Sequence, residues 1–370
     1  MEAAVQKPKK RLKYIDMTKG LGIFMITYGH VTALDTPVDH WMDLFKVTLF
    51  YIVAGYLISM KNNYTEISTW QYFKKLCKSL MIPYFTFSVV AILVRVAVRI
   101  LKYKEYMPLL KEYIYRTISL RGISTLWFLP TLLISEMVFF YILKRKGIWK
   151  KILMGLTFIW PVVLAIFVQK ELKIMSATMS EHQFMMVSFP ILAWSKGLVA
   201  VWFVQMGYFG YKILSKLKNL SARFGIGIVL SVLTIALSNW NPGIDFNNMK
   251  IGQHQWIFFV GSLMGTFGAL LVFEFLEKHF KLELFNYYGK NSLILMATQR
   301  GPMVINIAEQ GFKGAVRIEP KVGERYYLQT LVILGIILLM EYGIIEFINH
   351  KAPFMIGRKK KREEQAKMAQ

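Results

Sequence analysis

Residues 256–276 read WIFFVGSLMGTFGALLVFEFL, and Glu274 is the only charged residue among them. A hydrocarbon core of about 30 Å is crossed by about 20 mostly apolar residues in a helix. The stretch therefore predicts a transmembrane helix. Nine more segments resemble it, although those at 224–240 and 293–308 are weaker. The ten expected helices run over 15–34, 41–60, 80–101, 125–143, 152–169, 197–214, 224–240, 256–276, 293–308 and 327–348.

The composition of the whole chain agrees with a membrane protein. Hydrophobic residues make up 55% of its 370 residues, charged residues only 18%, and the mean hydropathy is +0.40. A soluble protein of this size needs more charged surface. These values exclude a disordered chain, a coiled coil, a secreted disulfide scaffold and an ordinary cytosolic enzyme. Because the sequence shows neither β-barrel alternation nor internal repeats, we expect an all-α fold, a polytopic bundle of about ten transmembrane helices.

The net charge of +24 is explained by topology. In a soluble protein it would suggest a nucleic-acid partner, but Lys and Arg gather in the cytoplasmic loops of membrane proteins. Both tails are basic, so we place both termini in the cytoplasm and expect no nucleic-acid partner. The basic loop at 102–121 is an exception, because ten helices place it outside. It is either an amphipathic segment on the membrane surface or a binding site for an anionic glycan or lipid headgroup.

The chain divides into one domain and two tails. The expected regions are a basic cytoplasmic tail at 1–14, a transmembrane domain at 15–350 and a basic cytoplasmic tail at 351–370. The first apolar stretch lacks an evident cleavage site, so it predicts a retained helix of a multi-pass protein in the cell membrane. The short apolar segment at 185–194 contains Pro190 and is either re-entrant or an extension of the sixth helix. One cysteine, Cys77, excludes an internal disulfide.

The first helix carries ionisable residues that are costly inside a bilayer. Lys19 and His30 are eleven residues apart, about three helical turns, so both side chains share one face roughly 16 Å apart along the axis. Such groups normally face a bundle interior or a wet cavity. His30 can take a proton from a hydroxyl, and Lys19 can hold an anion. Asp16 either pairs with Lys19 or interacts favourably with the helix dipole at the N-terminus of the helix. The alternatives are a structural histidine and a snorkelling lysine.

Two further places carry residues that can contact an anionic or acyl ligand. Lys75 and Lys78 lie one turn apart before the third helix, where they either clamp phosphates or anchor the helix at the membrane surface. Trp127 begins the fourth helix and is either an interfacial residue or part of a binding slot.

The ninth expected helix begins and breaks at polar residues. Its apolar run is preceded by Gly289, Asn291 and Ser292. This helix N-terminus can bind an anion, and the alternative is a helix start without a ligand. Gln299 and Arg300 interrupt the run just before Pro302. Because broken helices in membranes usually line cavities, we expect Gln299 and Arg300 to line one.

Together these motifs resemble acyltransferase family 3, a family of integral membrane acyltransferases, and most closely its fucose 4-O-acetylase-like acetyltransferases. The similar motifs follow one another in the family's order along most of the chain. They are Tyr14 to Gly20 with Gly29-His30, Phe50 to Leu57, Lys75-x-x-Lys78 before Pro83, Trp127-Phe128-Leu129, Gly289 to Ser292, and Pro353 to Gly357.

The sequence departs from the family's pattern at three positions, the first of which is Thr48, where the family usually has the proline of Pro-Leu-Phe before the second-helix motif. The serine of the second-helix motif is replaced by Ala54, and Gln299 occupies a position where the family often has a histidine. Since a glutamine cannot act as a base, a scheme with two histidines is in doubt, and His30 is the candidate base.

The resemblance implies transfer of an acyl group, most often acetyl, from acyl-CoA to a carbohydrate hydroxyl in cell-surface polysaccharide or glycolipid synthesis. It assigns the catalytic site to His30, Lys19 and Asp16. It assigns acyl-CoA binding to Lys75, Lys78, Trp127, Asn291 and Ser292. Acetyl-CoA would be a co-substrate rather than a bound cofactor, and the sequence suggests no metal site. A transporter or exporter of a glycan or small anion, and a regulatory membrane protein without catalysis, are the alternatives.

Overall fold

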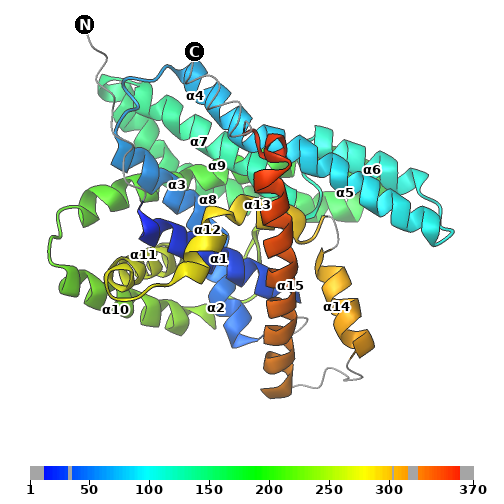
Figure 1. Ribbon diagram of the computed structural model, residues 1–370. Helices are drawn as coiled ribbons and strands as arrows, with labels where there is room; N and C mark the ends of the chain where they lie inside the picture. Colours follow the sequence, from blue (N-terminus) through cyan, green and yellow to red (C-terminus); the bar gives the residue numbers. More distant parts are fainter. Residues whose placement is uncertain (1–11, 32–35, 302–303, 316–323, 359–370) are drawn as a thin grey trace, which may run out of the picture.

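The computed structural model describes residues 12–31, 36–301, 304–315 and 324–358 (Figure 1). The first helices are α1 (Lys13–Val31), α2 (Pro37–Phe45), α3 (Thr48–Lys61), α4 (Thr69–Leu76), α5 (Ile82–Leu101), α6 (Met107–Ile118), α7 (Phe128–Lys144), α8 (Gly147–Thr178), α9 (Glu181–Leu214) and α10 (Leu220–Ser238). The remaining helices are α11 (Gln255–His279), α12 (Glu283–Lys290), α13 (Ser292–Thr298), α14 (Val304–Ala315) and α15 (Glu324–His350).

Shorter elements join these helices. Strands β1 (Ile244–Asp245) and β2 (Lys250–Ile251) pair antiparallel between α10 and α11. The single turns are the π-helical η1 (Cys77–Met81) and the 3₁₀ turns η2 (Ser124–Trp127), η3 (Phe246–Asn248) and η4 (Pro353–Ile356).

Within the described residues, eight helical segments are long and apolar enough to cross a membrane. They match eight of the ten expected helices, so the all-α membrane fold is confirmed. Of the other two, α1 carries Asp16, Lys19 and His30 within its 19 residues. The helix expected over 293–308 is interrupted, because α13 ends at Thr298 before α14 begins. The two segments that differ from an ordinary membrane helix are thus the ones that carry most of the candidate catalytic and cavity-lining residues.

Helices α3 and α9 pack closely through reciprocal glycines. A Cβ atom on Gly55 would lie 1.8 Å from the carbonyl oxygen of Val204, and one on Gly207 would lie 1.9 Å from that of Ile52. Only glycine lets the two backbones approach this closely. Because α9 also packs against α7 and α8, this crossing fixes the helices around the pockets described below.

Two ambiguous segments are helical. Helix α9 is continuous through Pro190, so the segment at 185–194 extends the sixth expected helix and is not re-entrant. The basic loop at 102–121 contains α6, which folds back along α5, and the pair projects from the side of the bundle (Figure 1). The hydroxyl of Tyr84 in α5 donates to the carbonyl oxygen of Thr117 in α6 at 2.8 Å.

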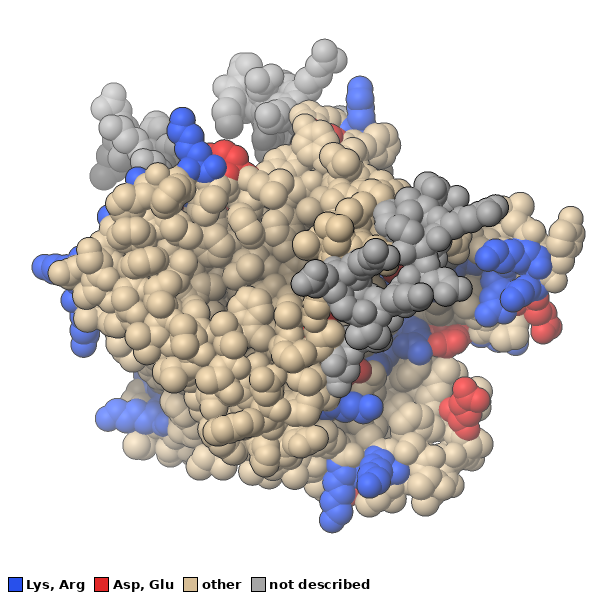
Figure 2. Space-filling view, turned by 90° about the horizontal axis from the view of Figure 1, so that it is seen from below, with Lys and Arg blue, Asp and Glu red and all other residues tan. Residues whose placement is uncertain are grey.

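The described beginning and end of the chain lie at one end of the bundle. Lys13 pairs with Glu283 of α12 at 3.0 Å, and η4 packs against η1. We call this end, which carries Lys75, Lys78, Lys290 and Arg358, the basic end. Its position agrees with the expectation that both termini share one side of the membrane. Where described residues are visible, the face of the molecule seen from below the view of Figure 1 is mostly uncharged, and its Lys and Arg side chains stand mainly along the edge (Figure 2).

Candidate active site

A cationic pocket opens at the basic end, and we call it the entrance pocket. It has a volume of about 310 Å³, and its walls come from η1, the α12–α13 junction and η4. Its cationic lining residues are Lys75, Lys78, Lys290 and Arg358. No Asp or Glu is found among the described residues that line it. This excess of positive charge suits a ligand with several negative charges.

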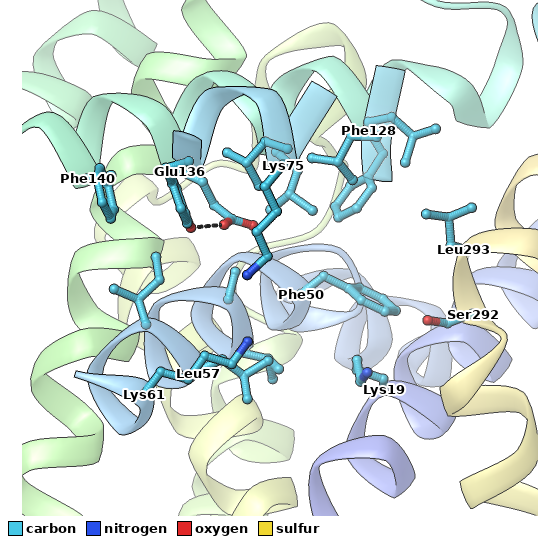
Figure 3. A pocket seen from close by; sticks show the side chains of 18 of the residues that line it. Lys19, Phe50, Leu57, Lys61, Lys75, Phe128, Glu136, Phe140, Ser292 and Leu293 are labelled. Atoms are coloured by element: carbon cyan, nitrogen blue, oxygen red, sulfur yellow. Dashed lines mark hydrogen bonds between the residues drawn. The ribbon is translucent and has the colours of Figure 1, made fainter. Parts of the chain in front are cut away.

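A second pocket, the inner pocket, adjoins the first at Lys75 and Leu293, which line both. It has a volume of about 270 Å³ and a mostly apolar wall. Lys75 reaches into it from one side, and Lys61 and Lys19 from the other (Figure 3). Beside them, Glu136 accepts a hydrogen bond of 2.5 Å from the hydroxyl of Tyr72.

Helix α1 presents Lys19 to the inner pocket through a close crossing with α12. A Cβ atom on Gly289 would lie 1.7 Å from the carbonyl oxygen of Asp16, so this glycine admits the α1 backbone. The carboxylate of Asp16 is buried and pairs with the Lys19 ammonium at 2.8 Å. Of the two expected roles for Asp16, pairing with Lys19 is therefore present. Ser292, at the start of α13, lines the same pocket.

A third pocket contains the histidine of α1, and we call it the His30 pocket. It has a volume of about 440 Å³. Its ionisable lining residues are His30, Asp43, Lys46, Asp245 and Arg300. The ammonium of Lys46 forms an ion pair with Asp43. Cations and carboxylates are thus balanced in this pocket, unlike in the entrance pocket.

The guanidinium of Arg300 lies against the imidazole of His30. The distance between Arg300 Nη1 and His30 Nδ1 is 3.4 Å. Because a guanidinium only donates hydrogen bonds, Nδ1 accepts, and the ring is neutral with its proton on Nε2. A contact of this length is weak, so a hydroxyl can replace the guanidinium at Nδ1.

The break after α13 brings Arg300 to this position. Arg95 of α5 donates to the carbonyl oxygens of Arg300 at 3.1 Å and Gly301 at 3.3 Å, which the end of the helix leaves unpaired. The hydroxyl of Thr27, one turn before His30, donates to Oε1 of Gln299 at 2.7 Å. These bonds tie the broken helix to α5 and α1.

The inner pocket and the His30 pocket adjoin. Phe128 and Met296 line both, from the start of α7 and from α13. The three pockets therefore follow one another from the cations of the basic end, past Lys19, to His30, and we call this series of pockets the route. Lys19 and His30, predicted to share one face of a helix, line successive parts of this route.

The structure separates the residues predicted to bind acyl-CoA. Lys75, Lys78 and Asn291 line the entrance pocket, and Ser292 lines the inner pocket. The amide nitrogen of Asn291 donates to the carbonyl oxygen of Tyr287, and its amide oxygen accepts from Asn349, each at 3.0 Å. The side chain therefore connects helices, and its hydrogen-bonding groups are already used within the protein.

Two placements differ from the expectation. Trp127, expected to bind acyl-CoA, lines the His30 pocket, because η2 places it beyond Phe128. The ammonium of Lys196 lies 4.4 Å from the centre of its ring. Gln299, expected to line a cavity together with Arg300, is fully buried and lines none of the pockets found in the described residues, because Thr27 holds it between helices.

Several charged residues of these pockets were not predicted from the sequence. Glu136 is the only charged residue within 125–143, and Asp43 and Lys46 interrupt the segment at 41–60. A charged side chain inside an otherwise apolar segment is the signal that could have identified them.

Comparison with known proteins identifies the chain. Neither the curated proteins nor the solved structures contain a match. A family model described as an acyltransferase domain, that of acyltransferase family 3, matches residues 12–342. All lining residues of the inner pocket and the His30 pocket fall inside the matched range. The chain belongs to acyltransferase family 3 and is a membrane acyltransferase.

Proposed function

We propose that the protein is an O-acetyltransferase that moves an acetyl group from acetyl-CoA to a carbohydrate hydroxyl, in the synthesis of a cell-surface polysaccharide or glycolipid. The observation that carries this proposal is the junction at Phe128 and Met296, where a pocket reached from a cationic entrance meets a pocket containing a neutral histidine. A transfer enzyme needs two binding sites that meet where the reacting atoms lie.

The entrance pocket suits the phosphates of CoA. Lys75, Lys78, Lys290 and Arg358 approach one space without a carboxylate among the described lining residues. The narrow inner pocket beyond it suits the pantetheine arm, with Lys19 and Ser292 in reach of its amides. The thioester then arrives at Phe128 and Met296. By the positive-inside rule the basic end is cytoplasmic, where CoA is found, in a multi-pass protein of the cell membrane.

The His30 pocket suits the acceptor. An acceptor hydroxyl that replaces Arg300 at Nδ1 of His30 gives its proton to this nitrogen as its oxygen attacks the thioester carbonyl. The new ester bond forms, the carbon–sulfur bond breaks, and the CoA thiolate takes up the proton. The guanidinium of Arg300, displaced from the ring, is then placed to stabilise the oxyanion.

Release of free CoA thiol by the purified protein tests this function. With acetyl-CoA and a carbohydrate acceptor, we expect thiol release that His30→Ala lowers by about 10²–10⁴-fold while acetyl-CoA binding is kept. His279→Ala is the matched control, because His279 is an exposed histidine at the end of α11, and should be neutral. A folded His30→Ala protein that releases thiol at the parent rate would refute the mechanism. An exporter would move its solute without consuming thioester.

A further inference from the structure

A fourth pocket, which we call the outer pocket, lies outside the proposed reaction route. It has a volume of about 1040 Å³ and is formed by the second half of α8, the first half of α9, the end of α6 and the β1–β2 loop. Its charged lining residues are Arg116, Arg121, Lys170, Lys173 and Lys250. No Asp or Glu lines it in the part of the chain that the structure describes.

Two carboxylates lie near these cations without lining the pocket: Asp245, which is paired with Lys250 across the β-ladder and interacts electrostatically with Arg121, and Glu112. Arg116 pairs with Glu112 at 2.6 Å. Lys170, Lys173 and Lys250 form no ion pair with any described residue. Lys170 and Lys173 lie one turn apart on α8, so their ammonium groups can meet the same anion.

Two buried polar atoms at the wall of the pocket have no hydrogen-bond partner among the described residues. They are Oγ of Ser188 and Nε of Arg121. Burial, with the nearby charge of Arg116, lowers the pKa of Arg121 to about 10, so its guanidinium is still charged at neutral pH. The guanidinium of Arg121 donates to Asn247 and Asn248 through its other nitrogens, so its charge is held at the wall of the pocket while one buried N–H and the Ser188 hydroxyl stay unpaired, which is costly.

Part of the wall is apolar and lies next to a lipid-facing helix. Ile166, Leu172, Phe184, Phe189 and Leu192 line the pocket. The membrane segment of α8 is only 17% buried inside the protein, which leaves most of its apolar surface for lipid. A ligand of the outer pocket can therefore place an apolar chain along α8 while its charged group meets the cations.

The outer pocket adjoins the His30 pocket at η3. Asn248 lines both, and its Oδ1 accepts a hydrogen bond of 2.5 Å from Arg121. The neighbouring Asn247 lines the His30 pocket and accepts from the fully buried Lys196 at 2.9 Å. Two amide side chains held by buried cations thus form the partition between the pockets.

We propose that the outer pocket binds the phosphate group of an amphiphilic acceptor, a sugar joined to an apolar chain through a phosphate or pyrophosphate. The phosphate meets Arg121, Lys170, Lys173 and Lys250, the chain lies along α8, and the sugar reaches past Asn248 to His30. The balanced charges of the His30 pocket suit an uncharged sugar, and the excess charge of the outer pocket suits the phosphate. Use of this ligand as acceptor rests on the proposed function, whereas its binding does not.

Binding measurements without donor test the proposal. The full-length protein in nanodiscs of uncharged lipid is titrated with a radiolabelled polyprenyl phosphate, and with the matching uncharged polyprenol. We expect the phosphate to bind, the polyprenol to bind at least about tenfold more weakly, and Lys170→Gln/Lys173→Gln/Lys250→Gln to weaken phosphate binding about tenfold or more. The control is Lys151→Gln/Lys216→Gln/Lys218→Gln, which removes the same charge from exposed positions outside the four pockets and should be neutral.

Competition identifies the source of the phosphate. Phosphatidylglycerol added in excess should displace little of the bound polyprenyl phosphate, whereas equal competition would mean a general site for bilayer phospholipid and would overturn the acceptor assignment. Unchanged binding by the pocket variant would overturn the site itself. If the probe binds as expected but no acceptor yields free CoA, the proposed function fails and the site stands. If a soluble sugar supports thiol release but the probe does not bind, the function stands and the site fails.

Discussion

The entrance pocket and the His30 pocket differ in how their charges are balanced. In the entrance pocket four cations face one space, and no carboxylate lines it among the described residues. In the His30 pocket Lys46 pairs with Asp43, and Arg300 lies against a neutral imidazole. The first pocket attracts a polyanion from water, whereas the second has little net charge and offers oriented hydrogen-bond donors and acceptors.

Because of this difference, we expect the residues that control acetyl-CoA affinity and those that control the rate of transfer to lie in different pockets of the route. Substitutions at the basic end should change the affinity for acetyl-CoA, and substitutions around His30 should change the rate of transfer at saturation. The inner pocket, which contains Lys19, lies between and should show both effects to a smaller degree. The following predictions test this separation, from the largest expected effect to the smallest.

The first prediction concerns Arg300. Arg300→Ala removes the cation proposed to stabilise the oxyanion, so kcat should fall by about 10²–10³-fold with little change in acetyl-CoA affinity. Steady-state kinetics and equilibrium binding on the same preparation measure the two quantities. Arg145→Ala, at an exposed arginine between α7 and α8, is the control. If Arg300→Ala instead weakens acetyl-CoA binding as much as it slows transfer, donor binding and catalysis are not divided between the entrance pocket and the His30 pocket.

The second prediction concerns Lys75 and Lys78. Lys75→Gln/Lys78→Gln should raise the Kd for acetyl-CoA by about 10- to 100-fold and leave the rate at saturation nearly unchanged, because charged hydrogen bonds to phosphate are lost. Binding by the parent should weaken with added salt, and the variant should respond less. Lys216→Gln/Lys218→Gln is a matched pair of exposed lysines outside the pockets. An unaltered Kd would mean that Lys75 and Lys78 only anchor η1 at the membrane surface.

The third prediction concerns Lys19. Lys19→Ala should lower kcat/KM for acetyl-CoA by about tenfold, because the inner pocket loses a cation beside the donor, and Lys19→Arg should keep most of the activity. Thermal unfolding in detergent checks that the variants are equally folded. Full activity of Lys19→Ala would limit this residue to its ion pair with Asp16.

The sequence predicted the features of this site that depend on residues close together in the chain. It did not predict the features that depend on tertiary packing. The helical period predicted that Lys19 and His30 share a face. The polar residues that begin at Gln299 indicated where the ninth expected helix is interrupted. The contact of Arg300 with His30 was not predicted, because it joins α1 to the break after α13 and the two residues are 270 positions apart in the chain.

Two other features show the same limit. The sequence marks Trp127 as the start of a helix, which is typical of the membrane interface, but η2 begins this helix inside the bundle beside His30. The hydrogen bonds from Arg95 that allow the break after Thr298 come from a helix whose sequence gives no sign of this role.

A structure of the protein with an acetyl-CoA analogue in which a methylene group replaces the thioester sulfur tests the central claim most directly. We expect its phosphates within hydrogen-bonding distance of Lys75 and Lys78, its pantetheine arm beside Lys19, and its acyl carbon between Phe128 and Met296, facing His30. A nucleotide bound in the His30 pocket, or an acyl group that ends far from Phe128 and Met296, would contradict the division between a donor pocket and a catalytic pocket.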